Sequence, residues 1–427
     1  MLRLDASAPG FSEDFTELVN ARRESDEDVQ RDVAKIIAAV RDQGDAAVRD
    51  FTRRFDGHDL EAGGWRVDPA YCRSAREGLP RELRAALELA AERITAFHER
   101  QKPVDTITTD SIGATLGNRW TPVESAGIYV PGGRASYPSS MLMNAIPAKV
   151  AGVERLVMVT PTKDSFTNPV VMAAAAIAGV EEIWRIGGAQ AIAALALGTD
   201  RIRPVDVITG PGNAWVAEAK RQLFGVVGID MIAGPSEIVI VADGLNNPKW
   251  IAADLLSQAE HDPSSQSILL TDDADFADAV VQAIDQIAPT LSTATTARTS
   301  WAAHGAVVLV PSLDEAIPLV NRLAPEHLQL ATDNAEALFA KVKHAGSVFL
   351  GRTTPEAIGD YIAGPNHVLP TGRRARFSSG LSVTDFMKRT TFLSLDEQAI
   401  RTIGPAAVTL AEAEGLPAHA LSVRQRL

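Results

Sequence analysis

The chain has 427 residues, 46% hydrophobic and 22% charged, which is the composition of a globular protein large enough for more than one core. Its formal net charge of −13 argues against nucleic acid or an anionic membrane as a partner, because both attract positively charged surfaces. A single cysteine, Cys72, excludes a disulfide framework and a thiolate metal cluster, and it fits the reducing cytoplasm where we expect the protein.

The first hundred residues are predicted to be mainly helical. Residues 1–20 carry acids and no long apolar run, so no signal peptide is predicted there. Apolar residues recur at spacings of three and four in 26–57 and in 79–102, as in amphipathic helices. Residues 114–133 are strand-like and end in a glycine turn.

From Arg155 onward, short strands alternate with helices of about ten residues. The predicted strands lie at 155–161, 182–188, 205–212, 237–243, 267–273, 305–312 and 347–351. The predicted helices lie between these strands. The longest apolar run, 170–180, is too short to cross a bilayer, so we expect a soluble protein. This order predicts an α/β fold with two doubly wound, Rossmann-like parallel sheets. The last residues, 404–427, are too few for a core of their own and must dock elsewhere.

Glycine clusters follow the predicted strands in 129–140, 185–198 and 207–220, and a fourth precedes the strand in 231–243. In open parallel sheets, ligands bind beyond the carboxyl ends of strands, where glycine lets backbone amides approach phosphate. None of the clusters is a true G-x-G-x-x-G, so they are equally compatible with tight turns and with a phosphate-bearing ligand.

Two short motifs contain residues that could carry chemistry. Gln258 and His261 have the i, i+3 spacing that shares a helix face, which suits either a metal site or a cap at the helix end. Glu326 and His327 are adjacent in "RLAPEHLQLAT", near a predicted helix, and could serve two proton transfers or simply form a surface pair. Cys72 lies far from the glycine clusters, so we assign it no catalytic role.

Further polar residues lie in loops and in the tail. Asp360 and His367 belong to the glycine- and proline-rich segment "GDYIAGPNHVLPTG", and Glu414 and His419 to "AEGLPAHALS". By themselves these patterns favour solvent-facing loop residues.

The motifs taken together resemble the histidinol dehydrogenase family from about residue 26 to residue 419. The resemblance depends on long, specific runs: "GIYVPGGRASYPSSMLMNAIPAKVAGV", "GGAQAIAALALGT", "GPGNAWVAEAKRQL", "GIDMIAGPSE", "LLSQAEHD", "PEHLQL", "GDYIAGPNHVLPTG" and "ARFSSGLSV". One departure is Arg373 and Arg374, where many members carry small residues.

The resemblance implies an enzyme that oxidises L-histidinol to L-histidine in two NAD-dependent steps through histidinal, with one zinc ion per site. Glu326 and His327 match the acid–base residues of the family, with His327 as the base and Glu326 activating water. The positions that match zinc ligands are Gln258, His261, Asp360 and His419. Those that match NAD contacts are Tyr129, Gln190 and Asn213. Those that match substrate contacts are Ser236, Gln258, His261, His327, Asp360, His367, Glu414 and His419.

The resemblance also implies a homodimer whose subunits share each active site. We expect one α/β domain from 24–128 and 236–380 with the metal and catalytic residues, and a second from 129–235 with the NAD-binding segments. Residues 1–23 and 381–404 would form a small dimerisation segment. Residues 405–427 would complete the partner's site. Three alternatives stay open: a related dehydrogenase for another polar alcohol, a zinc hydrolase using Glu326, and a non-catalytic nucleotide-binding scaffold.

Overall fold

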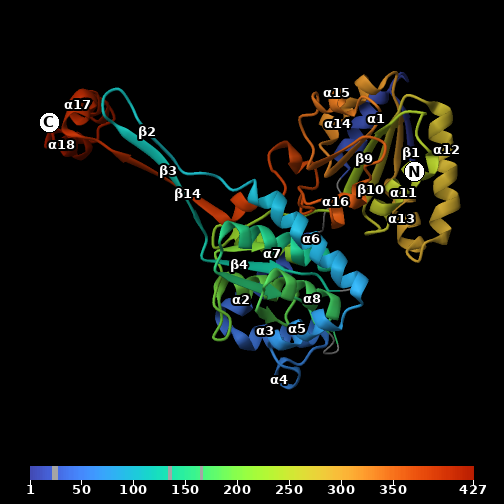
Figure 1. The fold of residues 1–427 in the computed structure, drawn as a ribbon, viewed down its shortest axis with the longest axis horizontal. Helices are drawn as coiled ribbons and strands as arrows, with labels where there is room; N and C mark the ends of the chain where they lie inside the picture. Colours follow the sequence, from blue (N-terminus) through green and yellow to red (C-terminus); the bar gives the residue numbers. More distant parts are fainter. Residues whose placement is uncertain (22–26, 133–136, 164–166) are drawn as a thin grey trace.

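The computed structural model describes residues 1–21, 27–132, 137–163 and 167–427. The described chain forms two parallel sheets, each covered by helices, and a long arm that projects away from both (Figure 1). Part of the predicted boundary near residue 24 and part of the first glycine cluster, 133–136, lie outside the described residues.

Sheet A has six parallel strands, and the three that begin at Glu237, Gln266 and His327 are buried along their whole length, as in parallel sheets covered on both faces. In spatial order they are β1 (Leu2–Asp5), β11 (Ala306–Leu309), β10 (Gln266–Thr271), β9 (Glu237–Ala242), β12 (His327–Ala331) and β13 (Ser347–Leu350). The chain runs outward from β9 in one direction and then returns to its other side at β12. The sheet is therefore doubly wound, with its switch point between these two strands.

Helices cover both faces of sheet A. One face packs on α11 (Pro248–Ala259), α12 (Ala274–Ile287) and α13 (Ala294–His304), with the short 3₁₀ turn η1 (Ala288–Thr290). The other packs on α1 (Phe11–Asn20), α14 (Leu313–Leu323) and α15 (Ala335–Phe339). The short helix α16 (Glu356–Tyr361) contacts α11 and β12. Since α11 runs antiparallel to the strands, its C-terminus returns to the edge where β9 and β12 begin.

Sheet B has five parallel strands with the same kind of winding. In spatial order they are β6 (Glu182–Trp184), β5 (Arg155–Val159), β4 (Ser125–Tyr129), β7 (Val207–Thr209) and β8 (Gly228–Ile229). One face packs on α7 (Pro138–Ala151) and α8 (Pro169–Ala178), which are covered by α5 (Pro69–Gly78) and α6 (Arg81–Glu99). The other packs on α9 (Gly188–Leu197) and α10 (Ala214–Leu223), which are covered by α2 (Glu27–Gln43) and α3 (Asp45–Asp56), with α4 (Leu60–Gly63) beside α3.

The arm is an antiparallel ribbon of β2 (Thr106–Thr109), β3 (Thr115–Pro122) and β14 (Met387–Ser394), which ends in α17 (Glu397–Ala413) and α18 (Pro417–Arg424). The 3₁₀ turns η2 (Arg374–Arg376) and η3 (Val383–Phe386) precede it. Figure 1 shows that the arm carries the C-terminus far from both sheets. Among the described residues, no helix combines the length and the apolar character needed to cross a membrane.

The predicted α/β fold with two doubly wound parallel sheets is confirmed, but several segments pack differently from the grouping expected from the sequence. Residues 27–99 cover sheet B rather than the sheet that starts near 236, because their apolar faces match α7–α10. Residues 2–5 form the edge strand β1 of sheet A, paired with β11, instead of joining 381–404 in a separate segment. Of residues 381–404, those from 387 onward belong to the arm together with the tail, whereas 381–386 pack against the helices of sheet B.

Candidate functional site

Three side chains meet where β9 and β12 begin, at the amino edge of sheet A. Glu237 is the first residue of β9, His327 is the first of β12, and Glu326 immediately precedes it. Because the two strands are parallel neighbours, with His327 paired to Ile238, their first residues lie side by side. The pair 326–327 therefore starts a strand, after α14 has ended, and is not part of a helix.

The backbone N–H and C=O of Glu237 orient the two predicted catalytic residues. Its carbonyl oxygen lies 3.0 Å from His327 Nδ1, and its N–H donates to Glu326 Oε2 at 2.9 Å. A carbonyl can only accept, so Nδ1 carries a hydrogen and Nε2 is the ring nitrogen left to accept a proton. Within the described residues Nε2 has no hydrogen-bond partner, and burial lowers the pKa of His327. The imidazole is thus held neutral and ready to act as a base.

The buried carboxyl of Glu326 lies close to His327, with Oε2 3.7 Å from Nδ1. Burial raises the pKa of Glu326 well above its ordinary value, and the charges of Glu237, Asp360 and Glu356 raise it further. A raised pKa makes the ionised form of a carboxyl a stronger base toward water. The position of Glu326 thus suits it to activate water.

The loop that follows α16 joins the two sheets across the site. His367 Nδ1 lies 2.9 Å from the backbone oxygen of Asp360, and its Nε2 lies 3.4 Å from Ser140 Oγ on α7. The Asp360 carboxylate lies 3.8 Å from His327 Nε2. A cavity of about 180 Å³ opens between these groups and is lined by all three of His327, Asp360 and His367. The cavity brings together residues from sheet A and from the loop that contacts the helices of sheet B.

Gln258 and His261 lie at the end of α11, as the spacing predicted. Gln258 Nε2 donates to His261 Nδ1 at 3.2 Å, and the fully buried Gln258 Oε1 has no partner in the described chain. The charge of His261 contributes to lowering the pKa of His327 and of His367, so the three imidazoles are close together. An unpartnered buried oxygen beside an imidazole and a carboxylate fits a cation that prefers nitrogen and oxygen ligands.

The predicted nucleotide residues lie at the carboxyl edge of sheet B. Tyr129 ends β4, and its hydroxyl accepts a hydrogen bond of 3.1 Å from the N–H of Gly188 at the start of α9. Gln190 is buried on the first turn of α9, and neither polar atom of its amide has a partner in the described chain. Gly210 approaches so closely that a Cβ on it would lie 2.2 Å from the Tyr129 carbonyl oxygen. Asn213 follows this turn and caps α10, so the three loops converge.

A sequence model of histidinol dehydrogenase matches residues 19–427. The chain is 64% identical to histidinol dehydrogenase of Zymomonas mobilis over 427 residues, which covers 100% of this chain and 99% of the relative. It is 60% identical to that of Ruegeria pomeroyi, with 99% and 98% covered. The chain belongs to the histidinol dehydrogenase family. The crystal structure of the histidinol dehydrogenase from Elizabethkingia anophelis matches it with a TM-score of 0.95 at 36% identity, covering 100% of this chain and 98% of that one.

Membership of the histidinol dehydrogenase family makes the chain an oxidoreductase, but one chain does not gather every predicted residue. Glu414 and His419 are exposed at the far end of the arm, away from the residues of sheet A (Figure 1). Ser236 directly precedes β9, where its backbone oxygen accepts from the N–H of Gln266 at 3.0 Å. Of the predicted site residues, His327, Asp360 and His367 line the cavity, and the two tail residues lie away from it.

Sequence reasoning missed Glu356. Its buried carboxyl lies 3.7 Å from His327 Nε2, and one oxygen has no partner in the described chain. Ligand atoms of His327, Glu356 and Asp360 all lie within 4.8 Å of one another. Burial, and then the charge of Asp360, raise the pKa of Glu356 to about 9. The available signal was the i, i+4 spacing of Glu356 and Asp360, which places both on one face of α16.

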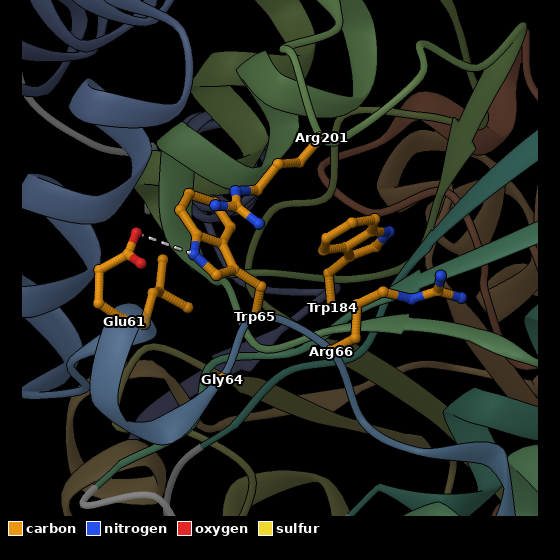
Figure 2. A pocket seen from close by; sticks show the side chains of 7 residues that line it. Glu61, Gly64, Trp65, Arg66, Trp184 and Arg201 are labelled. Atoms are coloured by element: carbon orange, nitrogen blue, oxygen red, sulfur yellow. Dashed lines mark hydrogen bonds between the residues drawn. The ribbon is translucent and has the colours of Figure 1, made fainter.

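Two features play no part in this site. Cys72 is buried in α5, and burial raises the pKa of its thiol to about 11, in agreement with its predicted inertness. A larger cavity of about 530 Å³ opens beside β6 and contains none of the predicted residues (Figure 2). There Arg201 lies over the Trp65 ring and Arg66 over the Trp184 ring, at 5.1 and 5.2 Å. Each guanidinium group thus covers one indole ring within this chain.

Proposed function

We propose that this chain oxidises L-histidinol to L-histidine with NAD, in two successive hydride transfers through histidinal, and so completes histidine biosynthesis in the cytoplasm. The observation that carries the proposal is the buried pair Glu326–His327, oriented by the backbone of Glu237, with His327 lining a cavity together with Asp360 and His367. Membership of the histidinol dehydrogenase family supports the choice of substrate.

His327 would take the proton of the substrate hydroxyl while the carbinol carbon loses hydride. Its Nδ1–H is fixed by the Glu237 carbonyl, so Nε2 is the atom that receives the proton. His327 would then return its proton to the aldehyde oxygen, while Glu326 removes a proton from the water that adds to histidinal. His327 would act as the base again when the resulting gem-diol loses the second hydride. This scheme uses no thiol, which agrees with the burial of Cys72.

Zinc would be held by Gln258, His261 and Asp360 of this chain together with His419 from a second copy. When bound, zinc supplies Lewis-acid chemistry that orients the oxygen and nitrogen of the substrate. The unpartnered Gln258 oxygen supports this set, and it leaves His327 free as a base. A cation held instead by His327, Glu356 and Asp360 would occupy the nitrogen that the reaction needs. We therefore favour the first set.

The substrate-binding site would be completed by residues of a partner chain in a homodimer. The arm exposes large apolar side chains that a second copy would cover, among them Ile107, Leu393, Leu410 and Leu421. Its length supports delivery of Glu414 and His419 to the other subunit, since neither lies near the site of its own chain (Figure 1). Glu414 would face the cationic amine of histidinol, which favours this substrate over an anionic alcohol.

One assay tests the proposal. Purified protein with zinc, NAD and histidinol should form histidine with about two NADH per histidine, as expected for two hydride transfers. The control is His327→Asn, which should form neither product at the parent rate. One NADH per turnover, or no NADH with this substrate, would contradict the proposal. Hydrolysis of an ester or amide without NAD would favour the zinc hydrolase alternative.

A further inference from the structure

A half-buried carboxylate, with one oxygen buried and unpartnered in the described chain, lies beside the nucleotide loops, outside every predicted set of site residues. Asp56 is the last residue of α3, and its Oδ2 is buried without a hydrogen-bond donor in the described chain. No cation of the described residues forms an ion pair with it. Burial alone raises the pKa of Asp56 to about 6, so the carboxyl is ionised near pH 8 at a cost in stability. A structural carboxylate normally has a donor, so this one requires an explanation.

The packing of α3 on α9 brings Asp56 to the carboxyl edge of sheet B. Asp45, at the start of α3, pairs with Arg201, just beyond the end of α9, with 3.3 Å between Nε and Oδ2. The two helices are therefore antiparallel, and the end of α3 lies beside the start of α9, where Gly188 donates to Tyr129. The charge of Asp56 contributes to raising the pKa of Tyr129, which agrees with this proximity.

Two neutral side chains on the packed helices α3 and α9 also have buried polar atoms without partners in the described chain. Gln190 has two buried amide atoms without hydrogen bonds, although its side chain is 1% exposed. Thr52 lies one turn before Asp56 on the same face of α3, and its buried hydroxyl has no partner in the described chain either. A metal would need more anionic ligands than this set provides. A ligand with hydroxyl groups of its own could form the hydrogen bonds that these polar atoms lack.

We propose that Asp56 accepts hydrogen bonds from the ribose hydroxyl groups of the nucleotide and thereby selects NAD over its 2′-phosphorylated form. This inference rests on the NAD dependence proposed above and extends it to a residue that determines specificity. In doubly wound sheets, an acidic side chain at the carboxyl edge of the strands binds the ribose in this manner. A 2′-phosphate would bring a second negative charge against the carboxylate and would leave it without donors.

The test is calorimetric binding of NAD and of NADP to the zinc-loaded protein, without substrate. Asp56→Asn should weaken NAD binding about ten- to a hundredfold, because it removes a charged acceptor. The affinity of the variant for NADP should fall much less or rise. The ratio of its NAD affinity to its NADP affinity should therefore decrease at least about tenfold. The matched control is Asp50→Asn, which removes the same charge from an exposed position on the same helix and should bind both nucleotides like the parent.

The outcomes separate this inference from the proposed function. A parent that binds neither nucleotide overturns both. A parent that binds NAD while Asp56→Asn keeps its affinity and its preference overturns the role of Asp56 alone. An equal loss for NAD and NADP also overturns it, since that pattern indicates a local structural defect. A selective loss for NAD, with an unchanged urea unfolding midpoint or a higher one, supports it.

Discussion

Asp56→Asn should make the protein more stable near neutral pH. Burial raises the pKa of Asp56 from 3.8 to about 6, a difference of about two units. One unit corresponds to about 1.4 kcal/mol, so the ionised carboxylate lowers the free energy of unfolding by about 3 kcal/mol at pH 8. The asparagine side chain has a similar shape and no charge, so it should recover most of this amount.

The direction of the pKa shift of Asp56 determines how the gain in unfolding free energy depends on pH. Because the pKa of Asp56 is higher in the folded than in the unfolded state, the carboxyl costs nothing below about pH 4, and the cost grows as pH rises through about 6. The gain from Asp56→Asn should therefore be about 3 kcal/mol at pH 8 and about 1.5 kcal/mol at pH 5. A residue that lowers stability while its loss impairs binding is typical of a functional site.

Urea unfolding followed by tryptophan fluorescence measures the change, since Trp65, Trp184 and Trp215 all pack around sheet B. Asp50→Asn serves as the control and should stay within about 0.5 kcal/mol of the parent, as exposed substitutions do. A variant that is less stable than the parent at pH 8 would refute the reasoning. So would a gain of equal size at pH 5 and pH 8, because an effect of charge burial must change with ionisation.

Three further predictions concern the catalytic centre and the loops. Glu326→Gln should slow the oxidation of supplied histidinal by about a hundredfold and affect the first oxidation less, and equal rates with histidinal would remove its role as a base. His261→Ala should lose zinc by elemental analysis, whereas His327→Asn should retain it; the reverse pattern would place the metal in the other group. Lys220→Met should lower the free energy of unfolding by about 3–5 kcal/mol in urea, because it leaves Asp230 buried and uncompensated, and an unchanged midpoint would contradict this.

The sequence predicted the two sheets because their strands are short apolar runs separated by amphipathic helices. It missed β12, although "HLQLA" alternates polar and apolar residues, because the run is only five residues long and lies close to the end of a predicted helix. It also failed at the arm, whose strands expose most of their side chains and whose pairing joins β3 to β14, far apart in the chain. Propensity cannot supply such partners, which come from tertiary contacts.

The candidate site likewise contains residues that the sequence could place and residues that only the tertiary structure places. Gln258 and His261 are close in sequence, and a helical spacing correctly predicted their contact. The role of Glu237 could not be predicted, because it acts through its backbone and the neighbouring strand. Asp56 was missed for a related reason: its sequence context is an ordinary helix end, and only the fold reveals that its carboxylate is buried without a donor.

Co-expression of two inactive variants tests whether the arm delivers His419 to a second subunit. His261→Ala and His419→Ala remove two proposed zinc ligands, one just after α11 and one in α18, which are far apart in one chain (Figure 1). In a mixed dimer with shared sites, one site inherits both lesions and the other inherits none, and random mixing makes about half of the dimers mixed. About a quarter of all sites should then be intact, and activity should recover to about a quarter of the parent value. If each chain builds its own site, every site carries one lesion. Mixed dimers confirmed by mass that show no activity would then exclude the shared site.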